Sequence, residues 1–152
     1  MKTVNSVDLS RYAGTWHEVA RMPNRFQRKC VRGTKADYAL RDDGRISVTN
    51  SCVLSNGKVD DVSGMARIVD TVSNAKLQVS FVSLFGWQLF WGDYWIIGLD
   101  GDYQWAVVGH PKRQYGWILA RSATPDAAVL ERAFTLLEQS GYARADFELS
   151  AP

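Results

Sequence analysis

Hydrophobic and polar residues alternate with a period of two in several short segments of the chain. In TKADYAL, Ala36 and Tyr38 share one face of an extended strand, whereas Lys35 and Asp37 share the other. Such alternation is typical of a strand that buries one face. RISVTNSC, SGMARIVD and AKLQVSF alternate in the same way. TWHEVAR, GDYWIIGLD, YQWAVVGH and YGWILAR are short and rich in β-branched and aromatic residues, so the pattern predicts eight strands.

The sequence RDDG marks a tight turn between two of these strands. A glycine after an aspartate readily adopts the positive φ that a hairpin turn needs, and we expect this of Gly44 after Asp43. Pairing Leu40 with Ile46 around this turn places two sets of side chains on one face. These are Thr34, Ala36 and Tyr38 on the first strand and Val48, Asn50 and Cys52 on the second.

The order of the elements predicts an all-β fold with one helix. Strands that follow one another every 8 to 14 or so residues, with no helix between them, favour antiparallel up-and-down connections and a sandwich or closed barrel. The helix is expected in TPDAAVLERAFTLLEQSG, with Thr124 as N-cap, Pro125 at N1 and Gly141 at C′. Its apolar stripe should pack outside the sheet: Val129, Leu130, Ala133, Phe134, Leu136 and Leu137. DFEL is expected to form a short ninth strand.

Composition adds a large apolar interior to this picture. The 152 residues are 46% hydrophobic and include six Trp, six Tyr and six Phe. We expect one domain over 1–152, with the barrel at about 12–122 and the helix at about 125–140. The formal net charge is only +2 and the charges are scattered, so nucleic acid is not an expected partner. The two cysteines lack a metal-site spacing, and we expect no metal and no cofactor.

The faces assigned to the interior combine small and large residues. Small residues such as Gly64 and Gly98 leave room, which favours a ligand cavity over a filled core. The alternative is that the inward aromatic side chains simply fill the core. If there is a cavity, we expect its lining to be Ala36, Tyr38, Val48, Asn50, Ala66, Leu77, Val79, Phe81, Tyr94, Ile96, Tyr115 and Trp117.

The stretch SLFGWQLFWGDYW is expected to form a loop or a hairpin extension between two strands. This stretch contains six large apolar side chains. A surface loop has no reason to carry so many unless they cap a pocket, meet a partner or touch a membrane. The alternative is that it folds inward over its own sheet. The six are Leu84, Phe85, Trp87, Leu89, Phe90 and Trp91.

Three segments in register carry a resemblance to a known family. GTWHEVAR resembles the G-x-W signature of the lipocalins, and LDGDYQWAVV and YGWILARSATP resemble that family's second and third signatures. The chain is most similar to the bacterial outer-membrane lipoprotein type, and thus to plant temperature-induced lipocalins and apolipoprotein D. The resemblance implies an eight-stranded antiparallel up-and-down barrel with one C-terminal helix packed outside. The signature residues here are Gly14, Trp16, Asp102, Tyr103 and Arg121.

The resemblance also implies roles for residues of the first strand. Trp16 would plug the closed end of the barrel, with the Arg121 guanidinium lying across its indole. Pro23 would end the strand where the first large loop leaves for the open end. Glu18 and Ala20 share the inward parity of Trp16, so we interpret Glu18 as a satisfied structural group or, alternatively, a ligand contact.

The two cysteines do not oppose each other in the simple hairpin register. Thr34 faces Cys52, and Cys30 lies four residues further along the chain, roughly 13 Å for an extended strand. A disulfide needs Cα atoms within about 7 Å, so the chain would have to turn back, which Gly33 allows. We predict a Cys30–Cys52 disulfide, which export would favour and cytosolic reduction would oppose.

The sequence favours a binding protein rather than an enzyme. It has no nucleophile elbow, phosphate-binding glycine loop or H-E-x-x-H helix, and His17 and His110 have the positions of surface residues. The resemblance implies storage or transport of a fatty acid or lysophospholipid for membrane lipid maintenance. The main alternative is a barrel without a ligand that uses its aromatic loop for protein interaction or homodimerisation. An enzyme that acts on its bound ligand, or a carrier of pigment or haem, are further alternatives.

The expected location is the bacterial cell envelope, in the periplasm or at the outer membrane. MKTVNSVDLS has neither the apolar region nor the cleavage site of a signal peptide, so either the export signal is absent from this chain or the protein is cytoplasmic. No run of about 18 apolar residues occurs in the sequence.

Overall fold

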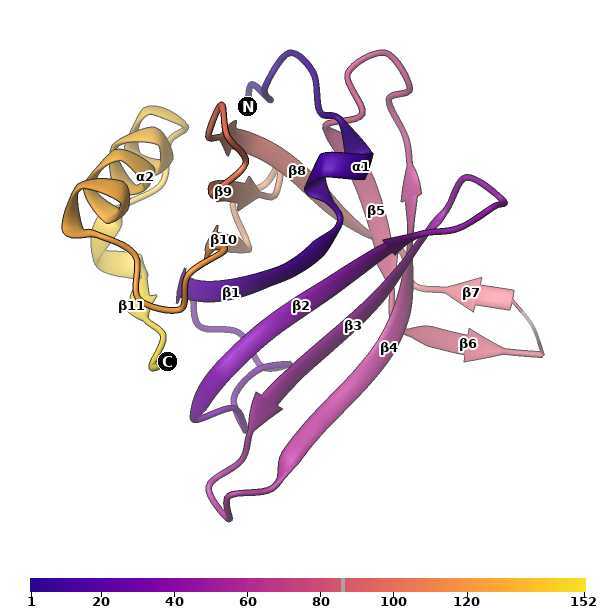
Figure 1. The fold of residues 1–152 in the computed structure, drawn as a ribbon, viewed down its shortest axis with the longest axis horizontal. Helices are drawn as coiled ribbons and strands as arrows, with labels where there is room; N and C mark the ends of the chain where they lie inside the picture. Colours follow the sequence, from indigo (N-terminus) through magenta and orange to yellow (C-terminus); the bar gives the residue numbers. More distant parts are fainter. Residues whose placement is uncertain (86) are drawn as a thin grey trace.

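Eight antiparallel strands form a closed barrel in the computed structural model, which describes residues 1–85 and 87–152 (Figure 1). The sheet order is β10-β9-β8-β5-β4-β3-β2-β1, and β1 pairs with β10 to close it. The fold predicted from the alternation and the resemblance is thereby confirmed. The strands are β1 Gly14–Arg21, β2 Arg32–Leu40, β3 Ile46–Val53, β4 Val59–Ile68, β5 Lys76–Ser80, β8 Gly92–Leu99, β9 Trp105–Gly109 and β10 Gly116–Ala120.

The β2–β3 hairpin has the register that its turn predicts. Leu40 pairs with Ile46, and Tyr38 pairs with Val48. The predicted pairing of Thr34 with Cys52 falls in an irregular stretch, because the register shifts between Arg32 and Lys35 where Gly33 adopts a φ of +63°. This irregularity turns the chain back toward β3. The Cα atoms of Cys30 and Cys52 lie 5.5 Å apart, and the predicted disulfide is present.

Successive connections alternate between the two ends of the barrel. The N-terminal segment and a short helix, α1 Leu9–Tyr12, cover one end, which we call the closed end; it is uppermost in Figure 1. Asp8 caps α1 by accepting hydrogen bonds from the amides of Ser10 and Arg11. The opposite end, which we call the mouth, carries the connections 22–31, 54–58, 81–91 and 110–115.

The C-terminal helix α2, Ala127–Gln139, packs outside the barrel against β8 and β9. Its N-cap is Asp126 rather than the predicted Thr124, so the helix begins after Pro125 instead of including it. The predicted end is confirmed: Gly141 has a φ of +93°, and the amides of Gly141 and Tyr142 donate to the carbonyls of Glu138 and Leu137 in a Schellman motif. The buried face carries Ala133, Phe134 and Leu137, all from the predicted stripe.

The barrel has an inner core and an outer core, which lies beneath α2. Two bulges turn residues that simple alternation would place in the inner core toward the outer core. The register shifts between Glu18 and Ala20 in β1, and between Ile96 and Gly98 in β8. Ala20 packs in the outer core, so its predicted inward position is wrong. Gly98 is also outward, because a Cβ there would lie 2.7 Å from Cδ1 of Leu136 on α2. The bulges reverse the parity on which both predictions depend.

Three short elements complete the fold. A hairpin of β6 Val82–Leu84 and β7 Trp87–Leu89 projects from the barrel wall between β5 and β8 (Figure 1). A 3₁₀ turn, η1 Arg144–Asp146, leads to β11 Glu148–Leu149, which pairs with the end of β1 and fulfils the prediction of a ninth strand. No helix in the described part of the chain is long and apolar enough to span a membrane.

Candidate functional site

Most of the predicted ligand-lining residues lie on the inner wall of the barrel. Ala36 and Asn50 pair with each other on the face that carries Tyr38 and Val48. Several inward side chains are only half-buried although the barrel surrounds them, so solvent reaches the inner wall. The residues that pack in the inner core are Tyr38, Val48, Ala66, Leu77, Val79, Phe81, Tyr94, Ile96 and Trp117.

Tyr115 differs from the other predicted lining residues because it precedes β10 and lies at the mouth. Its ring stacks on Trp117 with centroids 5.9 Å apart and planes within 4°. The ring centroid of Phe26, from the 22–31 connection, lies 6.3 Å from that of Tyr115. The ring centroid of His110 lies 5.6 Å from that of Tyr115. An aromatic group therefore borders the mouth on the side of β10.

Trp16 closes the opposite end as the resemblance implied. Its ring is fully buried, its Nε1 donates to the carbonyl of Tyr12, and Cζ of Arg121 lies 3.7 Å from the ring centroid. The guanidinium also donates to the backbone carbonyls of Arg11 and Thr15. Gly14 has a φ of +101°, which a residue with a side chain rarely adopts. These residues seal the closed end.

Of the second signature pair, Tyr103 makes the contacts and Asp102 is exposed. The Tyr103 hydroxyl accepts a hydrogen bond from the amide of Asp8, and its carbonyl accepts one from Nε of Arg121. The Arg11 guanidinium covers the Tyr103 ring at 4.2 Å. This signature therefore ties the N-terminal segment to the closed end.

Three tyrosines meet inside the closed end. The Tyr94 hydroxyl lies 2.7 Å from the Tyr12 hydroxyl and 2.9 Å from the Tyr38 hydroxyl. Burial raises the pKa of all three phenols, that of Tyr38 to about 12, so each is neutral at ordinary pH. Tyr12 was not predicted as a lining residue, because it belongs to α1 and has no place in the strand pattern.

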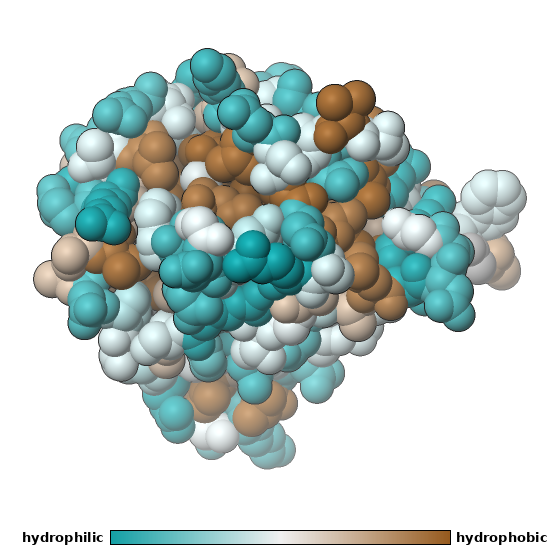
Figure 2. All heavy atoms as spheres, turned by 45° about the horizontal axis from the view of Figure 1, so that its top comes forward, coloured by the Kyte–Doolittle hydropathy of each residue, from teal (hydrophilic) through white to brown (hydrophobic). Residues whose placement is uncertain are grey.

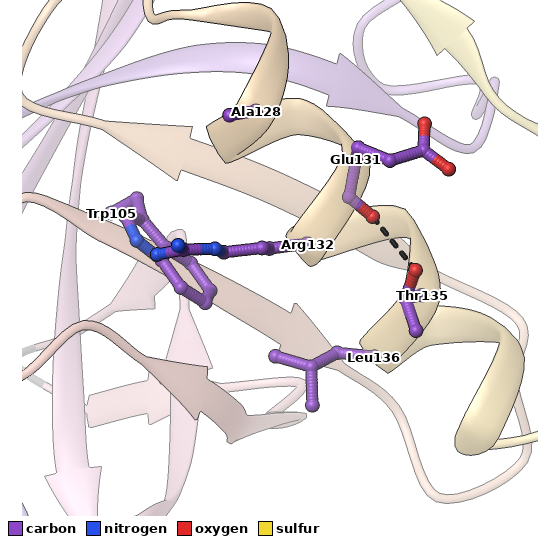
Figure 3. Close-up of a pocket in the computed structure, with 6 residues that line it drawn as sticks. All are labelled: Trp105, Ala128, Glu131, Arg132, Thr135 and Leu136. Atoms are coloured by element: carbon purple, nitrogen blue, oxygen red, sulfur yellow. Dashed lines mark hydrogen bonds between the residues drawn. The ribbon is translucent and has the colours of Figure 1, made fainter.

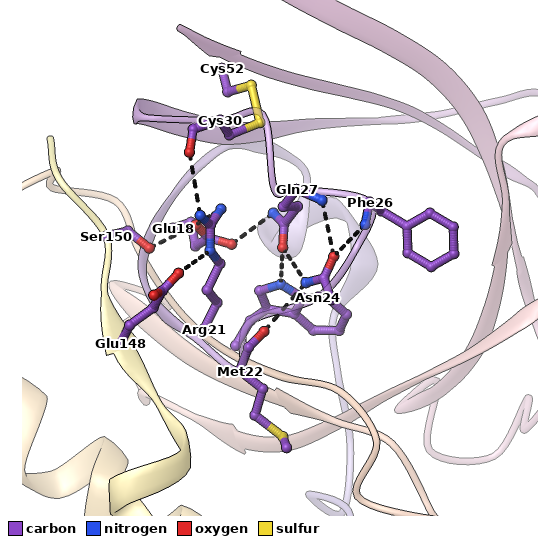
Figure 4. A network of polar contacts seen from close by, with 11 residues as sticks. Glu18, Arg21, Met22, Asn24, Phe26, Gln27, Cys30, Cys52, Glu148 and Ser150 are labelled. Atoms are coloured by element: carbon purple, nitrogen blue, oxygen red, sulfur yellow. Dashed lines mark hydrogen bonds and ion pairs between the residues drawn. A yellow bond between two sulfur atoms is a disulfide. The ribbon is translucent and has the colours of Figure 1, made fainter. Parts of the chain in front are cut away.

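Glu18 is the centre of a polar network just inside the mouth (Figure 4). Its carboxylate accepts hydrogen bonds from Nε2 of Gln27 at 2.8 Å and from Oγ of Ser150 at 2.7 Å, and Nη1 of Arg21 lies 3.5 Å away. Burial raises the pKa of Glu18, while these partners oppose the rise. The partners come from the protein itself, which supports the structural interpretation of this residue.

The same network fixes the 22–31 connection and the C-terminal segment. Gln27 accepts from Nε1 of Trp117 at 3.1 Å and from Nδ2 of Asn24 at 2.7 Å. Arg21 pairs with Glu148 of β11 at 3.0 Å. Sequence reasoning missed Gln27 and Ser150, because only barrel closure brings a loop and a distant chain end to the same carboxylate.

Two pockets lie outside the inner wall. One of about 370 Å³ at the mouth is lined by Arg21, Pro23, Asn24, Arg25, Arg28 and Glu148, and it gathers three cationic side chains. The other, of about 520 Å³, lies between α2 and the barrel (Figure 3). Its lining is Trp105, Ala128, Glu131, Arg132, Thr135 and Leu136, none of which was a predicted site residue.

The aromatic stretch does not fold inward over its sheet. Phe85 is 92% exposed, Phe90 82% and Trp87 74% on the projecting β6–β7 hairpin, which is at the right of Figure 2. Leu84 is also exposed, whereas Leu89 and Trp91 are half-buried. At the hairpin base, the guanidinium groups of Arg67 and Arg45 lie 4.0 Å and 5.5 Å from the centroid of the Trp91 ring.

Comparison with known proteins gives the family. A family model described as a lipocalin-like domain matches residues 7–152. The chain belongs to the lipocalin family. Temperature-induced lipocalin-1 of Arabidopsis thaliana is 38% identical over 145 residues, which cover 93% of this chain and 77% of that lipocalin. The outer membrane lipoprotein Blc of Escherichia coli K12 is 38% identical over 140 residues, covering 91% of this chain and 76% of Blc.

A solved lipocalin structure has the same architecture over the full chain. Insecticyanin from the tobacco hornworm Manduca sexta superposes with a TM-score of 0.79 at 26% identity, covering 100% of this chain and 84% of insecticyanin. In the described residues of this lipocalin, no group of three or more His, Cys, Asp or Glu side chains is arranged to hold a metal ion. The inner wall offers apolar contact and a few hydrogen-bonding groups, such as the hydroxyl groups of Tyr38 and Tyr94.

Proposed function

We propose that this lipocalin binds, stores or transports a small hydrophobic ligand in its barrel and is not an enzyme. The observation that carries the proposal is the inner wall, which is apolar and aromatic, sealed at the Trp16 end and still reached by solvent. Small-molecule sites combine such a lining with few polar groups. The lipocalin family, whose members bind small hydrophobic ligands, supports the same function.

Within this class, a fatty acid or a lysophospholipid fits best. Each methylene group removed from water stabilises the complex by about 0.8 kcal/mol, so an acyl chain suits the inner wall. Arg25 and Arg28 line the pocket at the mouth, where the carboxylate or phosphate of a chain that enters tail first would lie. We further propose a role in membrane lipid maintenance at the bacterial envelope, which the relatives named outer membrane lipoproteins support.

The β6–β7 hairpin adds a contact with an anionic membrane surface to this proposal. Its aromatic tip is exposed, and Arg45 and Arg67 place positive charge at its base. Apolar side chains next to cationic ones are typical of protein segments that enter the lipid interface. Homodimerisation through the hairpin is the competing function.

A titration tests the carrier function. The delipidated protein is titrated with a lysophospholipid and with a long-chain fatty acid while tryptophan fluorescence is followed. We expect saturable quenching at one site, strongly reduced in Trp117→Phe, because Trp117 faces the interior. Trp91→Phe is the matched control, since its ring lies between arginines at the hairpin base. A folded protein that binds neither lipid would refute the lipid-carrier function.

A further inference from the structure

The three tyrosines at the closed end form a rigid cluster built from separate elements. Tyr12 comes from α1, Tyr38 from β2 and Tyr94 from β8. The rings of Tyr12 and Tyr38 stack at 5.7 Å, and those of Tyr38 and Tyr94 meet edge to face at 6.1 Å. Because ring packing holds all three hydroxyl groups, their position inside the barrel is fixed without a ligand.

The hydrogen bonds of the cluster leave one donor over. Three phenols supply three O–H protons, and the cluster has two hydrogen bonds, one between the hydroxyl groups of Tyr94 and Tyr12 and one between those of Tyr94 and Tyr38. If Tyr12 and Tyr38 both donate to Tyr94, the Tyr94 proton is free. If Tyr94 donates to one neighbour, the proton of that neighbour is free. Every arrangement therefore leaves one phenolic proton for an acceptor outside the cluster.

The interior is the side from which an acceptor can reach this proton. Tyr12 is 4% exposed, whereas Tyr38 and Tyr94 are half-buried on the inner wall. Both pack against the inner core that contains Leu77 and Ile96. A ligand that extends to the closed end would thus end against the hydroxyl groups of Tyr38 and Tyr94.

The surroundings favour a neutral acceptor over an anionic one. Burial disfavours the ionised form of the phenols and would also disfavour a buried carboxylate. In the described part of the chain, no hydrogen bond joins a cationic side chain to the three hydroxyl groups. Arg121, which acts electrostatically on Tyr12, donates to backbone carbonyls instead.

We propose that the Tyr12–Tyr38–Tyr94 cluster is a binding subsite for a neutral oxygen acceptor, a hydroxyl or carbonyl group, at the buried end of an apolar ligand. This inference rests on the proposed carrier function and narrows its ligand. A plain acyl chain would leave the free proton against a methyl group. A chain that carries oxygen at its far end would satisfy it.

Matched ligands test this subsite. Saturated fatty acids and their ω-hydroxy counterparts are titrated at several matched chain lengths into the wild type, Tyr38→Phe/Tyr94→Phe and the two single variants. A hydroxyl buried without a partner lowers affinity by about 5-fold or more. We expect the wild type to bind the best ω-hydroxy acid at least as tightly as its plain counterpart. The double variant should bind that ω-hydroxy acid at least about 5-fold more weakly than the plain acid.

The outcomes separate a failure of the tyrosine subsite from a failure of the carrier function. Tyr142→Phe is the control, because Tyr142 packs in the outer core, away from the cluster, and this variant should keep the wild-type preference. If the wild type already binds every ω-hydroxy acid more weakly by the amount expected for an unpaired hydroxyl, the subsite is refuted while the carrier function stands. Binding of neither series would refute the carrier function itself. If the double variant fails to fold, the wild-type comparison and the two single variants decide. Each single variant retains one accessible phenol.

Discussion

At the scale of single residues, the interior chemistry depends on which buried polar groups find partners within the protein. Glu18 has two hydrogen-bond donors and a nearby guanidinium, so its carboxylate is satisfied before any ligand binds. The tyrosine cluster instead keeps one proton for an outside acceptor. The polar network at the mouth therefore stabilises the fold. We expect ligand selectivity to arise at the closed end.

Glu18 should make the stability of the protein depend on pH. Burial raises its pKa in the folded state above the ordinary 4.5. A raised pKa means that the stabilising contribution is complete below the unfolded value and is lost as the pH rises through the folded value. We expect the free energy of unfolding of the wild type to fall relative to that of Glu18→Gln between pH 4.5 and neutrality. Urea denaturation across this range measures the difference.

Ser150→Ala is the matched variant for this experiment. It keeps the carboxyl group but removes a donor that lowers the pKa of Glu18, so the midpoint of the pH dependence should move upward. Parallel pH profiles for the wild type and Glu18→Gln would contradict the assignment.

At the scale of elements, the bulges and the hairpin show how strands depart from simple alternation. The bulges in β1 and β8 turn Val19, Ala20, Ile97 and Gly98 toward α2, so one helix can pack closely on the barrel. The β6–β7 hairpin leaves the sheet, and the aromatic side chains of Phe85, Trp87 and Phe90 stay exposed. A contact outside the molecule would bury them.

The hairpin should bind anionic membranes. We expect the wild type to cosediment with vesicles that contain anionic lipid. Phe85→Ser/Trp87→Ser/Phe90→Ser should bind at least about tenfold more weakly, because burying each aromatic side chain contributes on the order of 1.5 to 3 kcal/mol. Arg45→Gln/Arg67→Gln should weaken binding to anionic vesicles only. Val72→Ser, at an exposed valine in the 69–75 connection of the closed end, should change nothing. Loss of a homodimer in the triple variant, without any vesicle binding by the wild type, would favour the dimer instead.

At the scale of the whole molecule, the barrel closes by more than its strand pairs. Beyond His17, β2 separates from β1, and the C-terminal segment fills the gap: the amide of Ser150 donates to Val19, and that of Gly33 to Ala151. The disulfide ties the 22–31 connection to β3, and Nη2 of Arg21 donates to the carbonyl of Cys30. The mouth is thus held by three segments distant in sequence.

Removing the disulfide should destabilise the fold without abolishing it. The bond joins residues separated by 22 positions, for which loop-closure entropy predicts about 3 kcal/mol. We expect Cys30→Ser/Cys52→Ser to lower the free energy of unfolding by about this amount, measured by urea denaturation. The reduced wild type should lose a similar amount. Equal stability of oxidised and reduced protein would show that the bond does not constrain the chain.

The sequence by itself determined the strands, the β2–β3 register and the closed-end signature. Alternation, turn residues and helix ends are local properties. The pairing of Tyr38 with Val48 and the helix end at Gly141 could therefore be assigned without tertiary contacts. Trp16 and Arg121 followed from the family signatures, because a recurring contact between distant residues leaves a recognisable pattern in the chain.

Only the tertiary structure decided the inward or outward orientation of Ala20 and Gly98, the tyrosine cluster and the mouth network. A bulge inserts one residue to suit the helix that packs on the strand, and a strand's own alternation carries no record of that helix. Tyr12, Gln27 and Ser150 lie in a short helix, a loop and a chain end, where no periodicity fixes direction. Closing the barrel brings them to their partners, so their roles are a property of the folded molecule.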